Sequence, residues 1–219
     1  MIIRVIDFET TGLPPDASVC EAAAVDLVGD PPEVGPCSQT LVQPTTEMTL
    51  EALATHHITA EQARTGMTWD DARAALEDGH PDVFVAHNAD FEKAFFDPEG
   101  AIWVDTYKVA LRLWPDAPRH TNQVLRYALG LNLDERAMPP HRALPDAWVT
   151  AHILLEALRI ATLQDMVRWT QEPSYLTKLT FGKHRGQKYS DVPRDYLQWL
   201  SRQDMDPGVI AAAKRELAN

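Results

Sequence analysis

A short apolar stretch at the N-terminus places the strongest limit on the fold. Residues 2–8 (IIRVIDF) are mostly apolar and β-branched, which predicts a short buried strand. Two further strand candidates, at residues 20–28 and 38–43, are set off by the turn-rich segments 29–32 (GDPP) and 35–36 (GP). Three successive strands joined by turns predict an antiparallel meander.

After the meander, the expected strands and helices alternate. Thr59 and Gln62 have the spacing of a capping box, and Thr68 precedes two acids, so helices are expected within residues 59–78. Strands are then expected at residues 83–86 and 102–104, and helices at 90–96, 106–113, 121–129, 144–158 and 162–170. This pattern predicts an α/β fold with a mixed sheet.

A short polar segment divides the expected elements into two groups. Residues 172–174 (EPS) have the composition of a linker. We therefore expect one domain over residues 1–171 and a small C-terminal module over residues 172–219. At 219 residues and 45% hydrophobic composition, the chain is long enough for one core and a smaller appendage.

The charge of the chain is unevenly distributed. The formal net charge is −12, which argues against a nucleic-acid partner because phosphate binding relies on Lys and Arg. From Lys178 onward, however, eight Lys or Arg stand against five Asp or Glu, a net of +3, so residues 1–177 carry −15. Cations bound by clustered acids would offset part of that charge and bridge to phosphate. The acidic composition is therefore compatible with a nucleic-acid partner.

The sequence predicts a soluble, cytoplasmic protein with no membrane partner. Its start does not resemble a signal peptide, and no apolar stretch reaches membrane-spanning length. Cys20 and Cys37 form no Cys-x-x-Cys motif, so we expect both to be reduced.

The first polar block, DFETTG at residues 7–12, ends the N-terminal strand. Asp7 and Glu9 are two residues apart, so they face the same side with Cα atoms roughly 6.6 Å apart. A cation between them would relieve their repulsion, although a solvated strand end would also tolerate both acids. A turn at Gly12 could bring the backbone N–H groups of Thr10 and Thr11 close to a phosphate.

The second block, HNADFE at residues 87–92, follows the expected strand at 83–86. Asp90 would begin a helix, where Asp is commonly only a cap, and Asn88 is a second cap candidate. A parallel arrangement with the first strand would instead place Asp90 beside Asp7, at the sheet edge where such folds bind ligands. On this block alone, both interpretations are open.

The third block, HRALPD at residues 141–146, contains an imidazole and a carboxylate. His141 and Asp146 are five residues apart, so they do not share a helical face. Pro145 fits the first turn of a helix, which places Asp146 on a rigid backbone and His141 on the preceding loop. A loop His is usually a surface residue, but imidazole also suits a general base near neutral pH.

In this order, the three blocks resemble the motifs of the DEDDh group of 3′-to-5′ exonucleases. The resemblance implies a ribonuclease-H-like fold, a mixed five-stranded sheet flanked by helices, and hydrolysis of phosphodiester bonds. It implies that Asp7 bridges two divalent metal ions, and that Glu9 and Asp146 complete the site of one. Asp90 completes the other, and His141 accepts the proton of the attacking water. Ligands that are all oxygen indicate Mg²⁺ or Mn²⁺ rather than zinc.

The resemblance also indicates substrate contacts near the first two blocks. The candidate residues are Thr10, Thr11, Gly12, Leu13, His56 and Asn88. His56 begins the segment HHIT, which is similar to an H-x-I-T segment near the substrate in the family, although Thr59 is explained equally well as a cap. In related enzymes an apolar residue near Leu13 packs on the terminal bases. A cover over the domain's own edge would explain Leu13 equally well.

The C-terminal module carries a second resemblance. The segment FGKHRGQK at residues 181–188, followed by Tyr196 and Trp199, is similar to the C-terminal module of the exodeoxyribonuclease X family. Its two glycines flank a basic run, which predicts a hairpin turn that presents Lys183, Arg185 and Lys188 to a nucleic-acid backbone. A solvated basic turn, with both aromatic residues in the core, is the alternative.

These observations predict a metal-dependent enzyme that hydrolyses DNA from the 3′ end to 5′-mononucleotides, in DNA repair or proofreading. The expected substrate is a single-stranded or frayed 3′ end, and a homo-oligomer or a repair partner is left open. The catalytic blocks do not distinguish DNA from RNA, so an RNA-directed 3′-to-5′ exoribonuclease is the first alternative. A polymerase-associated or nucleic-acid-associated accessory protein with an idle site is the second.

Overall fold

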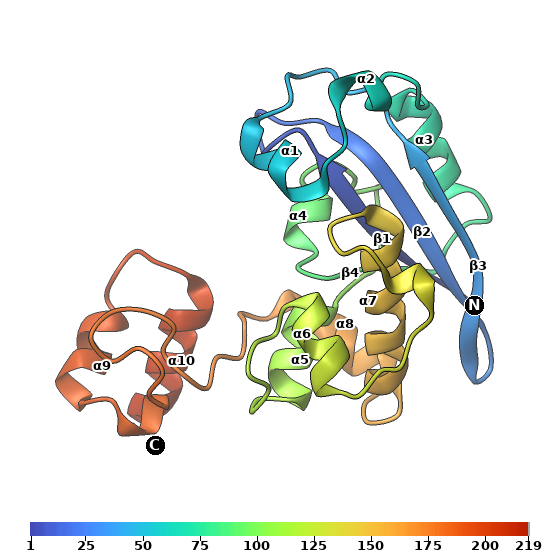
Figure 1. Ribbon diagram of the computed structural model, residues 1–219. Coiled ribbons are helices and arrows are strands. Elements are labelled where there is room, and N and C mark those ends of the chain that lie inside the picture. Colours follow the sequence, from blue (N-terminus) through green and yellow to red (C-terminus); the bar gives the residue numbers. More distant parts are fainter. Residues whose placement is uncertain (219) are drawn as a thin grey trace.

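The computed structural model describes residues 1–218 and is built around a five-stranded sheet (Figure 1). In spatial order the strands are β3 (Pro32–Leu41), β2 (Val19–Gly29), β1 (Ile2–Thr10), β4 (Val83–Ala86) and β5 (Trp103–Asp105). The pairs β1–β2 and β2–β3 are antiparallel, whereas β4 pairs in parallel with both β1 and β5. The predicted meander and mixed sheet are confirmed.

The third strand is longer than predicted. β3 begins at Pro32 and runs through Gly35 and Pro36, which we expected to form a turn. The register with β2 shifts here, so that Gly35 and Pro36 together face Asp26. An edge strand tolerates such a bulge and a proline, because its outer N–H groups need no partner strand. For this reason the predicted turn is wrong.

Most helices agree with the prediction. Their bounds are α1 (Leu50–His56), α2 (Ala60–Ala63), α3 (Trp69–Glu77), α4 (Asp90–Lys93), α5 (Thr106–Leu113), α6 (Asn122–Ala128), α7 (Ala143–Leu158), α8 (Leu163–Gln171), α9 (Arg194–Leu200) and α10 (Pro207–Ala218). Short 3-10 turns occur at Glu135–Ala137 and Tyr189–Asp191. Helix α5 has the predicted bounds, and α6, α7 and α8 differ from theirs by one residue at most. The capping box of Thr59 and Gln62 is present, whereas α4 ends three residues earlier than predicted.

Helix α1 was not predicted. Its side chains are largely exposed, with Leu50 at 79%, so the sequence shows no apolar face to mark it. Thr49 begins the helix by accepting a hydrogen bond from the backbone N–H of Ala52 (3.1 Å). The Thr49 N–H in turn donates to the carbonyl of Thr11 (2.9 Å). These contacts fix α1 beside the end of β1.

Alternation along β1 directs its side chains into two cores. Ile3 and Val5 pack in the cluster that contains α7, whereas Ile6 packs in the cluster on the opposite face of the sheet. Asp7 and Glu9 continue the face of Ile3 and Val5. At the end of the strand, the buried apolar face therefore changes to carboxylates near the N-terminus of α7.

Beyond α8, the chain forms the C-terminal module, residues 172–218, which lies to one side of the sheet (red in Figure 1). A backbone bridge between Lys178 and Lys188 closes a hairpin-like turn, as predicted. The helices of the module enclose an apolar cluster of their own, which Leu111 of α5 also joins. Within residues 1–218, no helix has both the length and the apolar composition needed to cross a membrane.

Candidate active site

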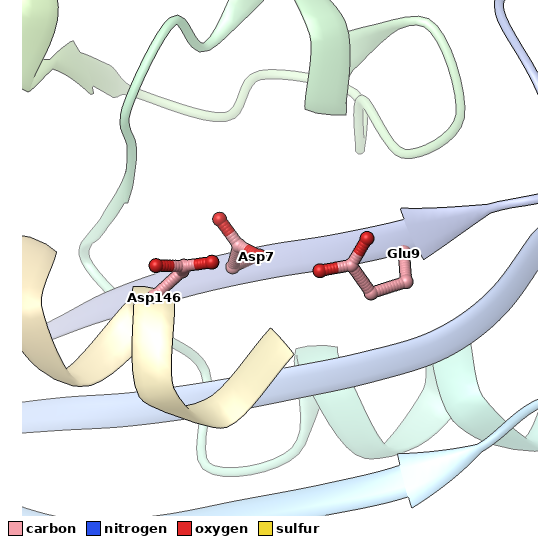
Figure 2. A group of neighbouring side chains, drawn as sticks. All are labelled: Asp7, Glu9 and Asp146. Atoms are coloured by element: carbon pink, nitrogen blue, oxygen red, sulfur yellow. The ribbon is translucent and has the colours of Figure 1, made fainter. Parts of the chain in front are cut away.

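Three carboxylates meet where β1 ends against α7 (Figure 2). Asp7 and Glu9 extend from β1, and Asp146 extends from the first turn of α7. One oxygen of each residue lies within 4.8 Å of the corresponding oxygens of the other two. They line a hollow of about 670 Å³ at the carboxyl end of β1, which we call the carboxylate pocket.

The fourth acid of the site is Glu92 rather than Asp90, and we call Asp7, Glu9, Glu92 and Asp146 the pocket carboxylates. Glu51 of α1 also lines the hollow but is exposed. Asp90 is exposed and lines a different hollow, whereas Glu92 is 3% exposed and lines the carboxylate pocket. Both residues lie in α4, where side chains two positions apart point about 200° apart around the helix axis. Only one of them can therefore face β1. The prediction that Asp90 lies beside Asp7 is wrong for this reason.

The sequence contained a signal for Glu92 that our prediction did not use. Phe96 is an apolar residue of the core, and its N–H donates to the carbonyl of Glu92 (2.9 Å). Residues four apart share one face of a helical turn. A core position at Phe96 therefore indicates that Glu92, and not Asp90, faces the sheet.

Burial raises the pKa values of the pocket carboxylates. Removal from water is the largest cause for Asp7, whose pKa lies well above its usual value, and repulsion from Glu92, Asp146 and Glu9 adds to it. Burial, followed by repulsion from Asp146, raises the pKa of Glu9 to about 8. Burial also raises the pKa of Glu92 to about 8, and it raises the pKa of Asp146. Cations would favour the ionised forms of these groups, so the pocket is suited to bind them.

One oxygen of Glu92 is without a hydrogen-bond partner in the described part of the chain. This atom, Oε2, is buried within the pocket wall. Burying a carboxylate oxygen without a partner is costly, and a bound cation would compensate that cost. Since all four acids offer oxygen, the ligand set fits Mg²⁺ or Mn²⁺.

Two donors fix the orientation of Asp146. The Nε2 amide of Gln123 donates to Oδ1 (3.1 Å), and the backbone N–H of His141 donates to Oδ2 (2.7 Å). Asn122, next to Gln123 on α6, donates to the backbone carbonyl of Asp146 (3.1 Å). Gln123 was not a predicted site residue, because it acts through a contact with a distant part of the sequence and belongs to no local motif.

His141 lines the carboxylate pocket from the loop before α7. The residue is exposed, and its backbone adopts a left-handed conformation with φ +60°. This conformation is uncommon for a residue other than glycine, so neighbouring contacts must hold it. The hydrogen bond from the His141 N–H to Asp146 is one of them.

An ion pair with a buried carboxylate anchors the same loop. Arg142 donates to both carboxylate oxygens of Glu21 on β2, and Glu21 Oε2 also accepts from the N–H of Ala143 (2.9 Å). The second contact caps the N-terminus of α7. Glu21 is 1% exposed and lies directly opposite Glu9 in the sheet, so Arg142 also offsets the repulsion between two acids. The prediction missed both residues; an acid within the apolar run at 20–28 was the available signal.

The turn after β1 forms one wall of the carboxylate pocket. Thr10, Gly12 and Leu13 line it, whereas Thr11 does not. The Thr10 hydroxyl donates to the carbonyl of Gly12 (2.7 Å), and the Thr11 hydroxyl bonds that of Thr46 (2.6 Å). Both hydroxyls therefore hold the turn in shape. Leu13 is 78% exposed at the edge of the pocket.

His56 and Asn88 also line the pocket. His56 is 3% exposed, and its Nδ1 accepts the N–H of Ile58 (2.9 Å). Its Nε2 is therefore the protonated nitrogen and donates to the carbonyl of Thr10 (3.2 Å). The His56 ring therefore links the segment at Ile58 to the end of β1. Lys183 and Arg185 line neither hollow and lie on the C-terminal module.

Comparison with known proteins agrees with this geometry. Residues 5–154, which include all four pocket carboxylates, match the family described as Exonuclease. The chain belongs to the DEDDh exonuclease family. It is therefore a hydrolase that acts on nucleic acids.

Individual relatives extend the match. Exodeoxyribonuclease 10 of Escherichia coli strain K12 is 35% identical over 234 aligned residues, which cover 100% of both chains. The structure of exonuclease X in complex with 5′ overhanging duplex DNA is 29% identical, with a TM-score of 0.67, and covers 77% of this chain and 99% of that chain. The nuclease domain of 3'hExo, a DEDDh family member bound to rAMP, is 19% identical with a TM-score of 0.60, over 72% of this chain and 92% of that chain. The last likeness concerns the fold alone. Together these matches confirm the predicted ribonuclease-H-like fold.

Proposed function

We propose that this exonuclease is a metal-dependent 3′-to-5′ exodeoxyribonuclease that releases 5′-mononucleotides, in DNA repair or proofreading. The observation that carries the proposal is the carboxylate pocket, which is lined by the buried Glu92, by the partly buried Asp7, Glu9 and Asp146, and by His141. DNA is supported as the substrate by the full-length relative, which is an exodeoxyribonuclease. We place the enzyme in the cytoplasm, in keeping with its two free cysteines.

The four pocket acids would hold two divalent metal ions, Mg²⁺ or Mn²⁺. Asp7, which lies between Glu9 and Asp146 in Figure 2, would bridge the two, and Glu92 would take the role that the sequence assigned to Asp90. When bound, two such ions activate a water and stabilise the leaving oxygen of the phosphodiester.

His141 would accept the proton of the attacking water. Its position on the pocket wall brings the imidazole to the hollow in which the scissile phosphate would lie. Its exposure allows the ring to pass the proton on to solvent after each cleavage. The ion pair of Glu21 and Arg142 would keep the loop in the required conformation.

The 3′-terminal nucleotide would occupy the carboxylate pocket beside the turn after β1. Thr10 and Gly12 would border the sugar and phosphate, and the exposed Leu13 would stack on the terminal base. Thr11 and His56 would act indirectly, since their polar groups already hold the turn. Asn88 would border the DNA strand that leads into the pocket.

The C-terminal module, residues 172–219, would form a second unit that binds DNA. Lys183 and Arg185 are exposed on its hairpin-like turn, and this part of the chain carries the net positive charge. Single-stranded or frayed 3′ ends would be the preferred substrates.

The test is degradation of matched single-stranded DNA and RNA oligonucleotides, labelled at the 5′ end, in Mg²⁺. We expect a ladder of 3′-shortened products on DNA, absent with EDTA and in the folded Asp7→Ala variant. A ladder on RNA alone would contradict the assigned substrate. No cleavage of either, with the protein folded and metal bound, would contradict the enzymatic function and favour an accessory role.

A further inference from the structure

The C-terminal module presents a row of aromatic rings. The ring centroids of His184 and Tyr196 are 4.8 Å apart, and those of Tyr196 and Trp199 are 5.3 Å apart. The Lys183 ammonium lies 5.1 Å from the centroid of the Tyr196 ring. Trp199 is 47% exposed, which leaves much of this large apolar side chain in water. We call the rings of Tyr196 and Trp199 the aromatic platform.

The basic loop, residues 181–188, is fixed against this platform. Gly182 has φ +68°, and a Cβ at this position would lie 2.9 Å from the Tyr196 hydroxyl. A side chain here would be strained by the left-handed conformation, and the Tyr196 hydroxyl would have to shift to make room for it. The loop backbone therefore packs directly on Tyr196. A surface that is already arranged loses little conformational entropy when a ligand binds.

The cations of the basic loop have no protein counter-charge. Lys183, Arg185 and Lys188 are exposed, and none forms an ion pair with any residue in the range 1–218. The loop itself contains no acid. These cations lie next to the exposed Trp199 and to Tyr196, which is partly buried against the core of the module. Cations beside an accessible aromatic ring form the combination that binds a single-stranded nucleic acid, because phosphates pair with the cations and bases stack on the ring.

A second hollow connects this surface with the carboxylate pocket. It has a volume of about 610 Å³ and lies between α5 and the C-terminal module, so we call it the inter-module hollow. Phe181, at the start of the basic loop, lines it and is 36% exposed. His87 and Asn88 line both hollows. A DNA strand that leaves the carboxylate pocket over Asn88 would therefore enter the inter-module hollow and reach Phe181.

Three acids border the inter-module hollow, but two of them are already engaged. Asp105 Oδ1 accepts the N–H groups of Asn88 (3.0 Å) and Tyr107 (2.9 Å). Asp206 Oδ1 accepts two N–H groups at the start of α10 (2.7 and 3.1 Å). The third, Asp90, is exposed. With aromatic and amide groups in the wall, the hollow suits bases, and the phosphates would face solvent and the basic loop.

We propose that the single DNA strand leading to the 3′ end crosses the inter-module hollow and binds the aromatic platform. In this path the bases pass Phe181 and stack on Trp199, while Lys183 and Arg185 bind the phosphates. The proposal rests on the proposed function and extends it, because it assigns the module the strand upstream of the scissile bond. The module thereby makes the affinity depend on the length of the strand.

The test compares two substrates of the full-length protein in Mg²⁺. One is an oligothymidylate of about 20 nucleotides, and the other is the p-nitrophenyl ester of thymidine 5′-monophosphate, which fills only the carboxylate pocket. Phe181→Ala and Trp199→Ala should each lower kcat/KM on the oligonucleotide about tenfold, since the removal of one base stack corresponds to roughly 5- to 150-fold. The loss should be far smaller on the ester.

The phosphate-binding cations have a separate readout. The double substitution of Lys183→Ala and Arg185→Ala should reduce the slope of log affinity against log salt by about 0.7 for each phosphate that is no longer neutralised. Lys214→Ala removes an exposed cation of α10 and is the matched control, for which the slope should not change.

Two results would overturn the proposal. One is that Phe181→Ala and Trp199→Ala keep the kcat/KM of the wild-type protein on the oligonucleotide. The other is an equal loss on both substrates by a variant that is folded, because the two side chains would then not act through the upstream DNA strand. If the wild-type protein cleaves neither substrate, the proposed function fails, and fluorescence anisotropy of the labelled oligonucleotide in EDTA then decides. Weaker binding by Trp199→Ala would support the platform, and unchanged binding would contradict it.

Discussion

The Gln123 amide and the backbone N–H of His141 each donate a hydrogen bond to one oxygen of Asp146. A ligand that is held in this way loses little freedom when a metal ion binds, so its partners influence the affinity for the ion. Gln123 reaches Asp146 from α6, a different helix. The orientation of Asp146 therefore depends on how α6 packs against α7.

Gln123→Met should weaken metal binding. The side chain keeps its approximate size but loses the amide, so Asp146 Oδ1 loses its donor. We expect about a tenfold rise in the Mg²⁺ concentration that gives half-maximal activity. The melting temperature in EDTA should change little. Gln171→Met, at an exposed position of α8, is the control, and an unchanged Mg²⁺ requirement for Gln123→Met would contradict this role.

The sequence allowed some of these residues to be placed and not others. Asp7 and Glu9 follow from the alternation of a strand, and Asp146 from a proline near the start of a helix. To place Glu92, one must know which face of the short helix α4 packs on the sheet, and a shift of two residues along the helix reverses that face. Gln123 could not be found, because a contact between distant segments leaves no local pattern.

At the scale of elements, the N-terminus of α7 depends on β2. The Glu21 carboxylate accepts hydrogen bonds from the Arg142 side chain and from the N–H of Ala143. One buried carboxylate therefore caps the helix and anchors the loop that carries His141. Glu21 also lies opposite Glu9 in the sheet. The contact that positions α7 therefore also brings the positive charge of Arg142 close to the acids of the pocket.

Arg142→Met should lower the free energy of unfolding by about 2–4 kcal/mol, because it leaves Glu21 buried without its partner. This lies somewhat below the usual cost of about 3–5 kcal/mol for breaking a buried pair, since the Arg142 side chain is 35% exposed. Arg159→Met is the control: its side chain is 74% exposed beside Glu156, so the loss should stay below about 1 kcal/mol. Urea denaturation measures both, and equal effects would argue against the anchor.

Elements with a regular pattern were predicted, and those that depend on tertiary context were not. Helix α5 has an apolar face and ends before a proline, so its bounds were correct. The turn expected at Gly35 and Pro36 is wrong because it ignores that β3 lies at the sheet edge. Helix α1 has only His56 buried and is held by contacts with the turn after β1.

At the scale of the whole molecule, the carboxylate pocket links stability to pH and metal. The folded-state pKa values of Glu9 and Glu92 are about 8, against an ordinary value of 4.5. Between these values the folded protein retains protons that the unfolded chain has released. Stability from this source is present at low pH and is lost as the pH rises through about 8.

In EDTA, the free energy of unfolding should therefore fall as the pH rises from about 4.5 to about 8 and level off above that. The part of this fall above about pH 7.5 is the most diagnostic, because ordinary histidines are largely neutral there. With Mg²⁺ the trend should reverse, since the ion binds the ionised carboxylates and stabilises the folded state. Urea titrations at several pH values measure this. The same pH dependence with and without Mg²⁺ would show that the pocket does not bind the ion.

The division of charge between the two parts of the chain was visible in the sequence, whereas their connection was not. The net positive charge of the segment from Lys178 onward follows from counting residues. That His87 and Asn88 border both hollows depends on how the module rests against α5.

The central claim is that Glu92 completes the carboxylate pocket and that Asp90 does not. It is tested most directly by comparing Glu92→Gln with Asp90→Asn in Mg²⁺-dependent cleavage of single-stranded DNA, with Mg²⁺ binding followed by calorimetry. We expect Glu92→Gln to lose activity by about 100-fold or more and to bind Mg²⁺ more weakly, and Asp90→Asn to stay within about twofold of wild type. Loss of activity in Asp90→Asn, with Glu92→Gln still active, would contradict the account.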